Sequence, residues 1–410
     1  RSSSKVGDMR QKAIMSPMLN NLRIGLEGYE LLRIEDKADL RVHVELRREL
    51  EPEVCPYCGA PGLRSKGRYE RRVRHLSCFG RHSELVIQTR RLKCNCCQRS
   101  FMPELPGIMP YRHSSEPFRN HIYEQHQRGI CASTLGQGQR LGQATVGRIY
   151  EQFTIRKAKE RISLNCPMYL GIDEHTLHKG QRFCTTFCDL KNHRVFDVHP
   201  GRSEEDLAAF LAALKGREKV RLVCIDLSSP YRRLVRKWFP RAKIVADRFH
   251  AVRLVYQHCV QLMRAIAPQI RNRRGSLTAL RKAPEKLTPE QRLRRDRLFE
   301  QYPAIKAIYE QMHALRTLMK HKRQTKKQCR MHIKELLGHI HKLKHSGLAP
   351  LQTLARSLKQ WIEPIALMWR FSKNNAITEG FHRKMKLIQR RAYGFKNFNN
   401  YRLRVIAQCG

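Results

Sequence analysis

Alternating apolar and polar side chains define the first predicted elements. Between residues 28 and 49 apolar residues recur at every second position, as in Val42, Val44 and Leu46, and a period of two is typical of half-buried β-strands. Two more strand-like runs, 69–76 and 85–92, follow in a cysteine-rich stretch. We therefore predict a β-strand pair in an N-terminal segment over 1–49 and a β module over 50–106.

The pattern changes to that of short helices after residue 114. Three helices are predicted, over 117–127, 132–140 and 144–159, and a run rich in glycine from Gly136 to Gly142 separates the last two. Three short helices in succession are typical of a small helical bundle or a helix-turn-helix. We assign residues 112–162 to such a domain.

Strand and helix patterns alternate between residues 168 and 247. The predicted strands cover 168–172, 182–189, 194–199, 220–225 and 242–246, and the predicted helices cover 203–214 and 231–239. Ser203 is a plausible N-cap for the first of these helices, with Asp206 three residues on. Adjacent strands followed by alternating helices and strands predict an α/β layer around a mixed sheet.

A long basic helical stretch follows this sheet. Between residues 251 and 370 apolar residues recur at spacings of three and four, as in Ile305, Ile308 and Met312, which gives each helix one apolar face. A last helix is predicted from Ala376. The fold class is therefore multidomain α/β, with a third domain over 167–406 that carries a helical insertion at about 251–370.

Charge narrows the class of partner. The 410 residues contain 81 Lys and Arg against 35 Asp and Glu, a formal net charge of +46. A folded chain tolerates such self-repulsion when it binds a polyanion, and nucleic acid gains affinity from every phosphate that is neutralised. No apolar run approaches the ~18 to 20 residues that span a bilayer, so we expect no membrane partner and a cytoplasmic, reducing location.

Two cysteine pairs predict a zinc site. Cys55 and Cys58 form one Cys-x2-Cys knuckle, and Cys94 and Cys97 form a second, with Cys96 as an alternative to Cys97. Four thiolates close a tetrahedral shell that suits Zn²⁺. The competing interpretation is a set of unrelated core cysteines.

The third helix of the 112–162 domain has the pattern of a DNA-recognition helix. Val146 and Ile149 fall on its apolar face, whereas Gln143, Thr145 and Arg148 fall on the opposite face near its start. A recognition helix presents such N-terminal polar residues to base edges in the major groove. A small helical bundle without this role would show the same pattern.

Carboxylates follow three of the predicted strands. Asp173, Asp226 and Asp247 each come directly after an apolar run, and strand ends in an α/β sheet face the crevice where ligands bind. Converging carboxylates can hold Mg²⁺ or Mn²⁺ for phosphodiester chemistry. The alternative is that any one of them caps a helix or pairs with an arginine. Glu174, next to Asp173, is expected to point to the opposite side of the strand.

The predicted helix from Ala376 adds a fourth acid and a basic face. Glu379 lies in its first turn, and Lys384, Lys386, Arg390 and Arg391 follow it. Basic residues beside a carboxylate site are suited to hold the phosphate backbone of DNA.

Four stretches together resemble one protein family. They are GIDEHTLHKGQRFCTTFCDL, LVCIDLSSPYR, VADRFHAVRLV and NNAITEGFHRKMKLIQRRAYGFKNF, and they are similar to the bacterial insertion-sequence transposases of the ISL3 group. That family places a zinc segment with four cysteine ligands first, then a helix-turn-helix, then an RNase H-like catalytic domain. The resemblance covers about residues 40–406 in the same order.

The resemblance implies roles for particular residues. Asp173, Asp226 and Glu379 correspond to the catalytic Asp-Asp-Glu set, and Asp247 and His250 correspond to a supporting Asp-x2-His element. One position departs from the family pattern, because His382 stands where the family usually has asparagine after the phenylalanine.

The resemblance also implies the function and the partners. We expect a transposase that binds the terminal inverted repeats of an insertion sequence, cuts a strand and joins it to target DNA, as a homodimer or larger assembly on double-stranded DNA associated with the bacterial nucleoid. A DNA-binding regulator derived from an inactive transposase and an RNA-binding protein are the competing hypotheses. The RNA hypothesis requires exposed aromatic platforms on a sheet, and no aromatic-rich strand pair supplies one.

Overall fold

The structure is a computed structural model, and it describes residues 25–37, 41–48, 52–78, 80–178, 182–272, 274–371 and 376–410. The first 24 residues of the predicted N-terminal segment lie outside the described residues. The chain divides into two compact units, Arg1–Phe153 and Thr154–Gly410.

The first unit is built on one sheet. Its strands are β1 (Tyr29–Lys37), β2 (Arg41–Arg48), β3 (Leu63–Cys78), β4 (Arg81–Cys94) and β5 (Ser100–Phe101). The order is β1-β2-β4-β3, with β5 paired to β4. Because β2 runs parallel to β4, the predicted strand pair and the cysteine-rich segment share one sheet and one buried cluster around Leu46, Leu85 and Ile87. The boundary expected at residues 49/50 therefore falls inside a single sheet.

Three helices complete the first unit and lead into the second. They are α1 (Glu116–Arg128), α2 (Ala132–Gly138) and α3 (Gln143–Arg161). Val146, Ile149 and Phe153 are buried in the cluster that joins these helices. The boundary between the units falls within α3 rather than at residues 162–167, since the later residue Ala158 packs against Ile406 of the second unit.

The second unit contains a mixed sheet, as the sequence predicted. Its strands are β6 (Tyr169–His178), β7 (Arg182–Asp189), β8 (Arg194–Pro200), β9 (Leu222–Ile225) and β10 (Lys243–Ala246). The order is β10-β9-β6-β7-β8. The pairs β6–β7 and β7–β8 are antiparallel, whereas β6–β9 and β9–β10 are parallel.

Two helices make the crossovers between the later strands. They are α4 (Glu204–Ala213) and α5 (Ser229–Trp238). Ser203 caps α4 in a reciprocal pair of contacts with Asp206, which confirms the predicted helix start and satisfies two backbone N–H groups.

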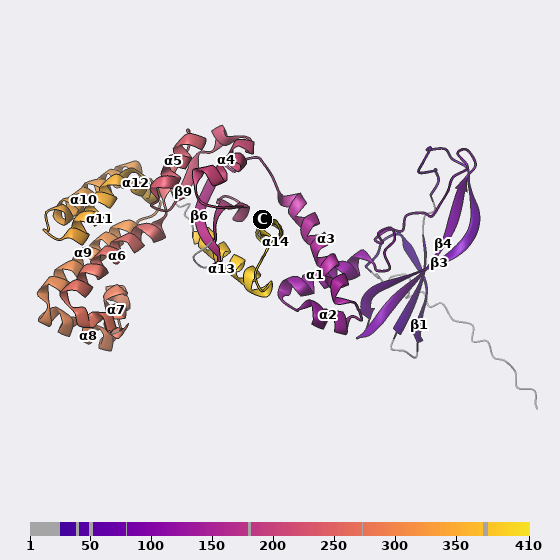
Figure 1. The fold of residues 1–410 in the computed structure, drawn as a ribbon, viewed down its shortest axis with the longest axis horizontal. Coiled ribbons are helices and arrows are strands. Elements are labelled where there is room, and N and C mark those ends of the chain that lie inside the picture. The colour runs from indigo at the N-terminus through magenta and orange to yellow at the C-terminus, as the bar shows by residue number, and fades with distance from the viewer. Residues whose placement is uncertain are drawn as a thin grey trace, which may run out of the picture. The chain divides into compact units, whose positions relative to one another are not determined.

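A group of helices follows β10 and lies together on the side of α5 in Figure 1. They are α6 (Arg248–Ile266), α7 (Arg274–Arg281), α8 (Pro289–Gln301), α9 (Pro303–Lys320), α10 (Lys326–Lys344), α11 (Ala349–Gln360) and α12 (Ile362–Arg370). Their buried side chains, Trp361 and Trp369 among them, belong to the same cluster as those of the sheet. The buried Arg248 guanidinium donates to the backbone carbonyls of Met319, His321 and Met368, so it joins the start of α6 to the ends of α9 and α12.

Two C-terminal helices return to the sheet. The helix α13 (Ala376–Arg391) packs against β6, and α14 (Phe398–Cys409) packs against β8. None of the helices in the described part of the chain is long and apolar enough to span a membrane.

An ion pair fixes α14 on the sheet. Arg402 on α14 donates from Nε and Nη2 to the two carboxylate oxygens of Asp197 on β8, both at 2.6 Å. Asp197 is only 2% exposed. Burial tends to raise the pKa of Asp197, but hydrogen bonds from His199 and Arg402 outweigh this effect and lower that pKa. The charged pair is therefore the native form over the neutral range.

Replacing Arg402 with alanine is expected to destabilise the second unit by about 3–5 kcal/mol near neutral pH, because it leaves a buried charge without its partner. The pKa of Asp197 is lowered on folding, so the ion pair stabilises above the unfolded carboxyl pKa of about 3.9 and loses this effect as pH falls. The difference between wild type and Arg402→Ala in urea unfolding should therefore shrink on acidification. Lys396→Ala, at an exposed position, is the control and should change stability by less than about 0.5 kcal/mol. An Arg402→Ala protein as stable as this control would contradict the assignment.

Candidate functional site

The strand register aligns three aspartates in one row. On β6 and β9, Gly171 is paired with Cys224, and two residues further along this register Asp173 is level with Asp226. On β9 and β10, Ile225 is paired with Ala246, and one residue further Asp226 is level with Asp247. Neighbouring strands lie about 4.8 Å apart, so three carboxylates start from adjacent positions at one edge of the sheet.

Burial and mutual repulsion act on two of these acids. Burial raises the pKa of Asp173 to about 7, and the negative charges of Asp226 and Asp247 add to this against the opposing effect of His250. Burial also raises the pKa of Asp226 to about 6, with contributions from the charges of Glu174 and Asp247. The positive charge of His250 therefore does not fully offset the burial and mutual repulsion of these carboxylates.

The row is suited to a divalent cation. Among the described residues, the Oδ1 atom of Asp226 is buried and has no hydrogen-bond partner. An uncompensated carboxylate oxygen next to other carboxylates is a hard oxygen ligand of the kind that Mg²⁺ and Mn²⁺ prefer. The chemistry of the oxygen donors fits such an ion, although among the described residues only the cysteines, and not these acids, form a group of three or more ligand atoms close enough to hold a metal.

Asp247 and His250 form a pair at the start of α6. Asp247 caps the helix by accepting from the backbone N–H of Phe249, and its Oδ2 lies 2.7 Å from Nδ1 of His250. This hydrogen bond, together with the charges of Asp247, Asp173 and Asp226, raises the pKa of His250 against the effect of burial. Asp247 therefore caps a helix, as the alternative interpretation expected, and its charge also acts on Asp173 and Asp226.

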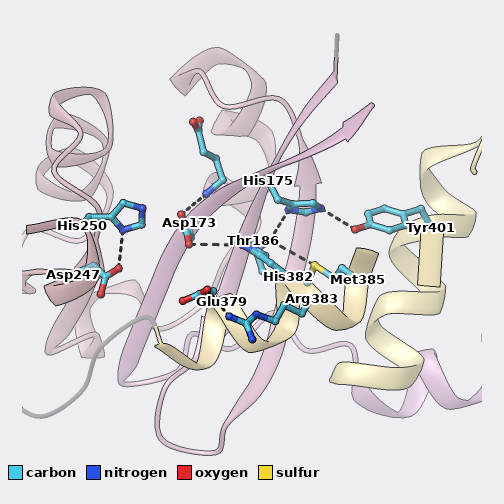
Figure 2. A network of polar contacts seen from close by, with 11 residues as sticks. Asp173, His175, Thr186, Asp247, His250, Glu379, His382, Arg383, Met385 and Tyr401 are labelled. Carbon is cyan, nitrogen blue, oxygen red and sulfur yellow. Dashed lines mark hydrogen bonds and ion pairs between the residues drawn. The ribbon is translucent and has the colours of Figure 1, made fainter. Parts of the chain in front are cut away.

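Glu379 approaches the row from α13. Figure 2 shows Asp173, Glu379 and His382 in the same view of β6 and α13. The Nδ1 atom of His382 lies 3.8 Å from Oδ2 of Asp173, and the charge of Glu379 acts on the pKa of the same imidazole, which burial lowers to about 4. Glu379 is half exposed and also accepts from Arg383 at 3.0 Å. His382 is thus a neighbour of both Asp173 and Glu379.

A chain of buried polar contacts runs from His382 to α14 (Figure 2). The Thr186 hydroxyl lies 3.2 Å from Nε2 of His382 and 3.0 Å from Nδ1 of His175. Nε2 of His175 is 2.8 Å from the Tyr401 hydroxyl. Since Thr186 has one proton to donate, at least one of the two imidazoles must donate to it. The chain links β6, β7, α13 and α14 directly behind the carboxylates.

The sequence analysis missed several residues of this site. His175 and Thr186 lie in the first of the four quoted stretches but were given no role, Tyr401 lies outside all four, and Arg383 was not named among the basic residues of its helix. Glu174 was expected to point away from the row, yet its charge acts on Asp226. Only the departure at His382 was visible in the sequence, and the structure places that residue beside Asp173.

The four predicted cysteines come together in the first unit. The Sγ atoms of Cys55, Cys58, Cys94 and Cys97 all lie within 4.8 Å of one another. Cys55 and Cys97 are separated by 3.6 Å, and Cys58 and Cys94 by 3.7 Å. Tetrahedral Zn–S bonds of about 2.3 Å place sulfur atoms about 3.8 Å apart. The geometry selects Cys97 over the exposed Cys96.

The four cysteines lie in and beside two tight turns, at residues 56–58 and 95–97. In the first turn, the backbone N–H of Gly59 donates to the Cys55 carbonyl at 2.9 Å, and Gly59 has a positive φ of 69° that glycine adopts without strain. Against the effect of burial, hydrogen bonds from the backbone of Tyr57 and Cys58 lower the pKa of the Cys55 thiol to about 7. In the same cluster, the backbone of Arg99 tends to lower the pKa of the Cys97 thiol, but burial and hydrogen bonds with the other three cysteines raise that pKa to about 11. In this structure Cys55 is therefore the thiol whose metal-binding thiolate form is favoured.

The predicted DNA-contacting residues are accessible. Gln143 and Arg148 are exposed and Thr145 is half-buried, at the start of α3. The Arg148 guanidinium donates to the Thr145 hydroxyl at 3.1 Å. On α13, the exposed basic residues are Lys384, Lys386, Arg390 and Arg391. Lys384 also donates to the backbone carbonyl of Gln408.

Comparison with known proteins found family matches over the segments that contain both sites. A family model of the ISL3 type with an Asp-Asp-Glu site, described as transposase, matches residues 170–405. A model described as the zinc-finger of transposase IS204/IS1001/IS1096/IS1165 matches residues 51–97. The chain is 27% identical over 401 residues to the transposase for insertion sequence element IS1001 of Bordetella parapertussis, covering 93% of this chain and 96% of that protein. The two matched segments contain the carboxylate row and the cysteine cluster.

The cluster predicts one tightly held zinc ion for each chain. The protein should release it on Cys58→Ser substitution, because three thiolates hold the ion less tightly than four. Cys96→Ser is the matched control, since Cys96 lies in the same turn but outside the cluster. Elemental analysis after gel filtration measures the metal content. Equal loss of zinc in the two variants would show that the ligand set is wrong.

Proposed function

The chain belongs to the ISL3 family of transposases and is a DNA transposase of the Asp-Asp-Glu type, and from this premise we propose that Asp173, Asp226 and Glu379 are its catalytic acids. Zn²⁺ and a divalent ion such as Mg²⁺ or Mn²⁺ are its cofactors. The observation that carries the proposal is the parallel pairing of β6 with β9, whose register, continued two residues past the pair Gly171–Cys224, brings Asp173 level with Asp226. Glu379 joins them through its shared neighbour, His382.

The three acids would hold the divalent ions, which supply an activated water or 3′-hydroxyl and stabilise the leaving oxygen in phosphodiester transfer. Asp173 and Asp226 are fixed by the sheet, so their side chains need little reorganisation to bind. Glu379 enters from a helix and is half exposed, which leaves it accessible to DNA. The neighbouring Arg383 restrains the Glu379 carboxylate through their ion pair.

Supporting residues act on these acids through charge and position. His250, held by Asp247, lies in electrostatic reach of Asp173 and Asp226 and reduces the repulsion between them. Thr186, His175 and Tyr401 are positioning residues, because they hold the imidazole of His382 that contacts Asp173. On α13 the basic side chains Lys384, Lys386, Arg390 and Arg391 would bind the phosphate backbone.

The second unit is proposed to be an RNase H-like core. Its five-stranded mixed sheet supports this assignment, with Asp173 within β6 and with Asp226 and Asp247 directly after β9 and β10. Between β10 and α13 the helices α6 to α12 form the insertion, and because Arg248 joins them to the sheet they are expected to move with it.

The first unit is proposed to read the element ends. The cysteines Cys55, Cys58, Cys94 and Cys97 would hold Zn²⁺. The helices α1 to α3 would form a helix-turn-helix, in which Gln143, Thr145 and Arg148 face base edges in the terminal inverted repeats. Two ends must be cut together, so a homodimer or larger assembly on DNA is expected. The alternative of an inactive regulator is not favoured, because the chain matches transposases and all three acids are present.

Nicking of a labelled element-end duplex in Mg²⁺ tests the catalytic assignment. Asp173→Asn, Asp226→Asn and Glu379→Gln should each lower the rate at least about a hundredfold, since a catalytic metal contributes several kcal/mol and each 1.36 kcal/mol is tenfold. Binding of the duplex should be retained. Glu310→Gln, at an exposed position on α9, should nick at the wild-type rate. Wild-type binding without any nicking would favour the regulator, and nicking by the Asp173→Asn protein would reject the catalytic set.

A further inference from the structure

A large groove follows the exposed face of α6. Its volume is about 1180 Å³, and its lining includes Phe249, Arg253, Tyr256, Gln257, Arg264 and Arg281. The first five of these lie on α6 and the last ends α7. The groove therefore runs along α6 and is closed by the end of α7.

One end of the groove lies next in sequence to the carboxylate site. Phe249 is the second residue of α6, next to His250, and the two rings meet edge to face at 5.5 Å. The cap of the same helix is Asp247, which is level with Asp226 in the sheet. Figure 2 shows Asp247 and His250 on the side of Asp173 opposite His382. A chain that occupies the groove would thus be continuous with whatever lies at the acids.

The lining has the charge of a polyanion site. Three of its nine residues are arginines and none is acidic. Within the described part of the chain, no ion pair is formed by Arg253 or Arg281, and the Nε atom of Arg264 is buried without a hydrogen-bond partner. Guanidinium groups without carboxylate partners are suited to bind phosphate in bidentate fashion.

The groove also offers an aromatic surface and a sufficient length. Phe249 is 53% exposed, which is unusual for a large apolar ring and leaves it accessible to the face of a base. From Phe249 to Arg264 the helix rises about 22 Å, at 1.5 Å per residue. That length corresponds to about six nucleotides at 3.4 Å along one strand.

We infer that the α6 groove, from Phe249 to Arg281, binds the DNA strand that continues from the phosphodiester held at Asp173 and Asp226. Arginines along the groove hold its phosphates, and Phe249 stacks on a base next to the reacting phosphate. The inference rests on the proposed function, since the strand is placed by the carboxylate site. The strand could belong to the element or to the flanking DNA, and these share the same chemistry.

Binding of end duplexes of increasing length by the full-length protein tests the groove. One series is lengthened by up to ten base pairs on the element side of the cleavage site, and the other on the flanking side. Wild type should gain affinity with length in one series, which identifies the source of the strand. The variant Arg253→Gln/Arg281→Gln should lose this gain, and its slope of log affinity against log salt should fall by about 0.9 for each phosphate contact removed.

Three controls make the result specific. Arg330→Gln removes an exposed arginine of α10 outside the groove and should keep the full gain with length. Phe249→Ala should reduce the affinity for the longer duplex, and Phe249→Trp, which keeps a stacking ring, should preserve it. A gain with length that is unchanged in both the double-arginine variant and Phe249→Ala would overturn the inference.

Nicking in the same samples separates this inference from the proposed function. If wild type nicks the duplex and the groove variants bind as wild type does, the groove assignment is wrong while the catalytic assignment stands. If no nicking occurs but the gain with length depends on Arg253 and Arg281, the groove binds DNA and the catalytic proposal is the one that fails.

Discussion

The register of three parallel strands is the constraint on which the second unit depends. Pairing of β6 with β9 and of β9 with β10 sets Asp173, Asp226 and Asp247 in one row. Like charges at this spacing repel one another, and burial adds to the cost of ionising them. The apolar runs before each aspartate supply the burial that holds the strands in register, so the same residues that stabilise the sheet also create an uncompensated negative site.

Different residues around the three aspartates fix the elements that carry them. In the sequence Asp247-Arg-Phe-His250, the aspartate caps α6, Arg248 joins the helix to the ends of α9 and α12, Phe249 faces the groove, and His250 faces the acids. On the other side, the chain from His382 through Thr186 and His175 reaches Tyr401. The adjacent Arg402 fixes that tyrosine's helix to β8 through Asp197. The proposed metal site thus has a rigid support on both sides.

Much of this arrangement could be predicted from local patterns, and the remainder depends on contacts distant in sequence. A period of two identified the strands of residues 28–49, and short apolar runs identified the strands before the aspartates. The cysteine pairs identified the cluster, and Ser203 identified the start of α4, because each signal is contained within a few residues. The parallel pairing of β2 with β4 was not visible, since nothing in either strand specifies its neighbour. Thr186 and Tyr401 were missed for the same reason, because their contacts with His175 and His382 arise only when β6, β7, α13 and α14 come together. The roles of Asp226 and Glu379 came from a family resemblance, because 152 residues separate them in the chain.

The central claim is that Asp173 and Asp226 hold a divalent ion together, and locating Mn²⁺ by anomalous X-ray diffraction tests it most directly. The account predicts an anomalous peak within about 2.3 Å of a carboxylate oxygen of each aspartate. That peak should be absent from crystals of the Asp226→Asn protein, while the zinc signal at Cys55 and Cys94 persists. Manganese bound elsewhere, or by only one of the two aspartates, would contradict the account.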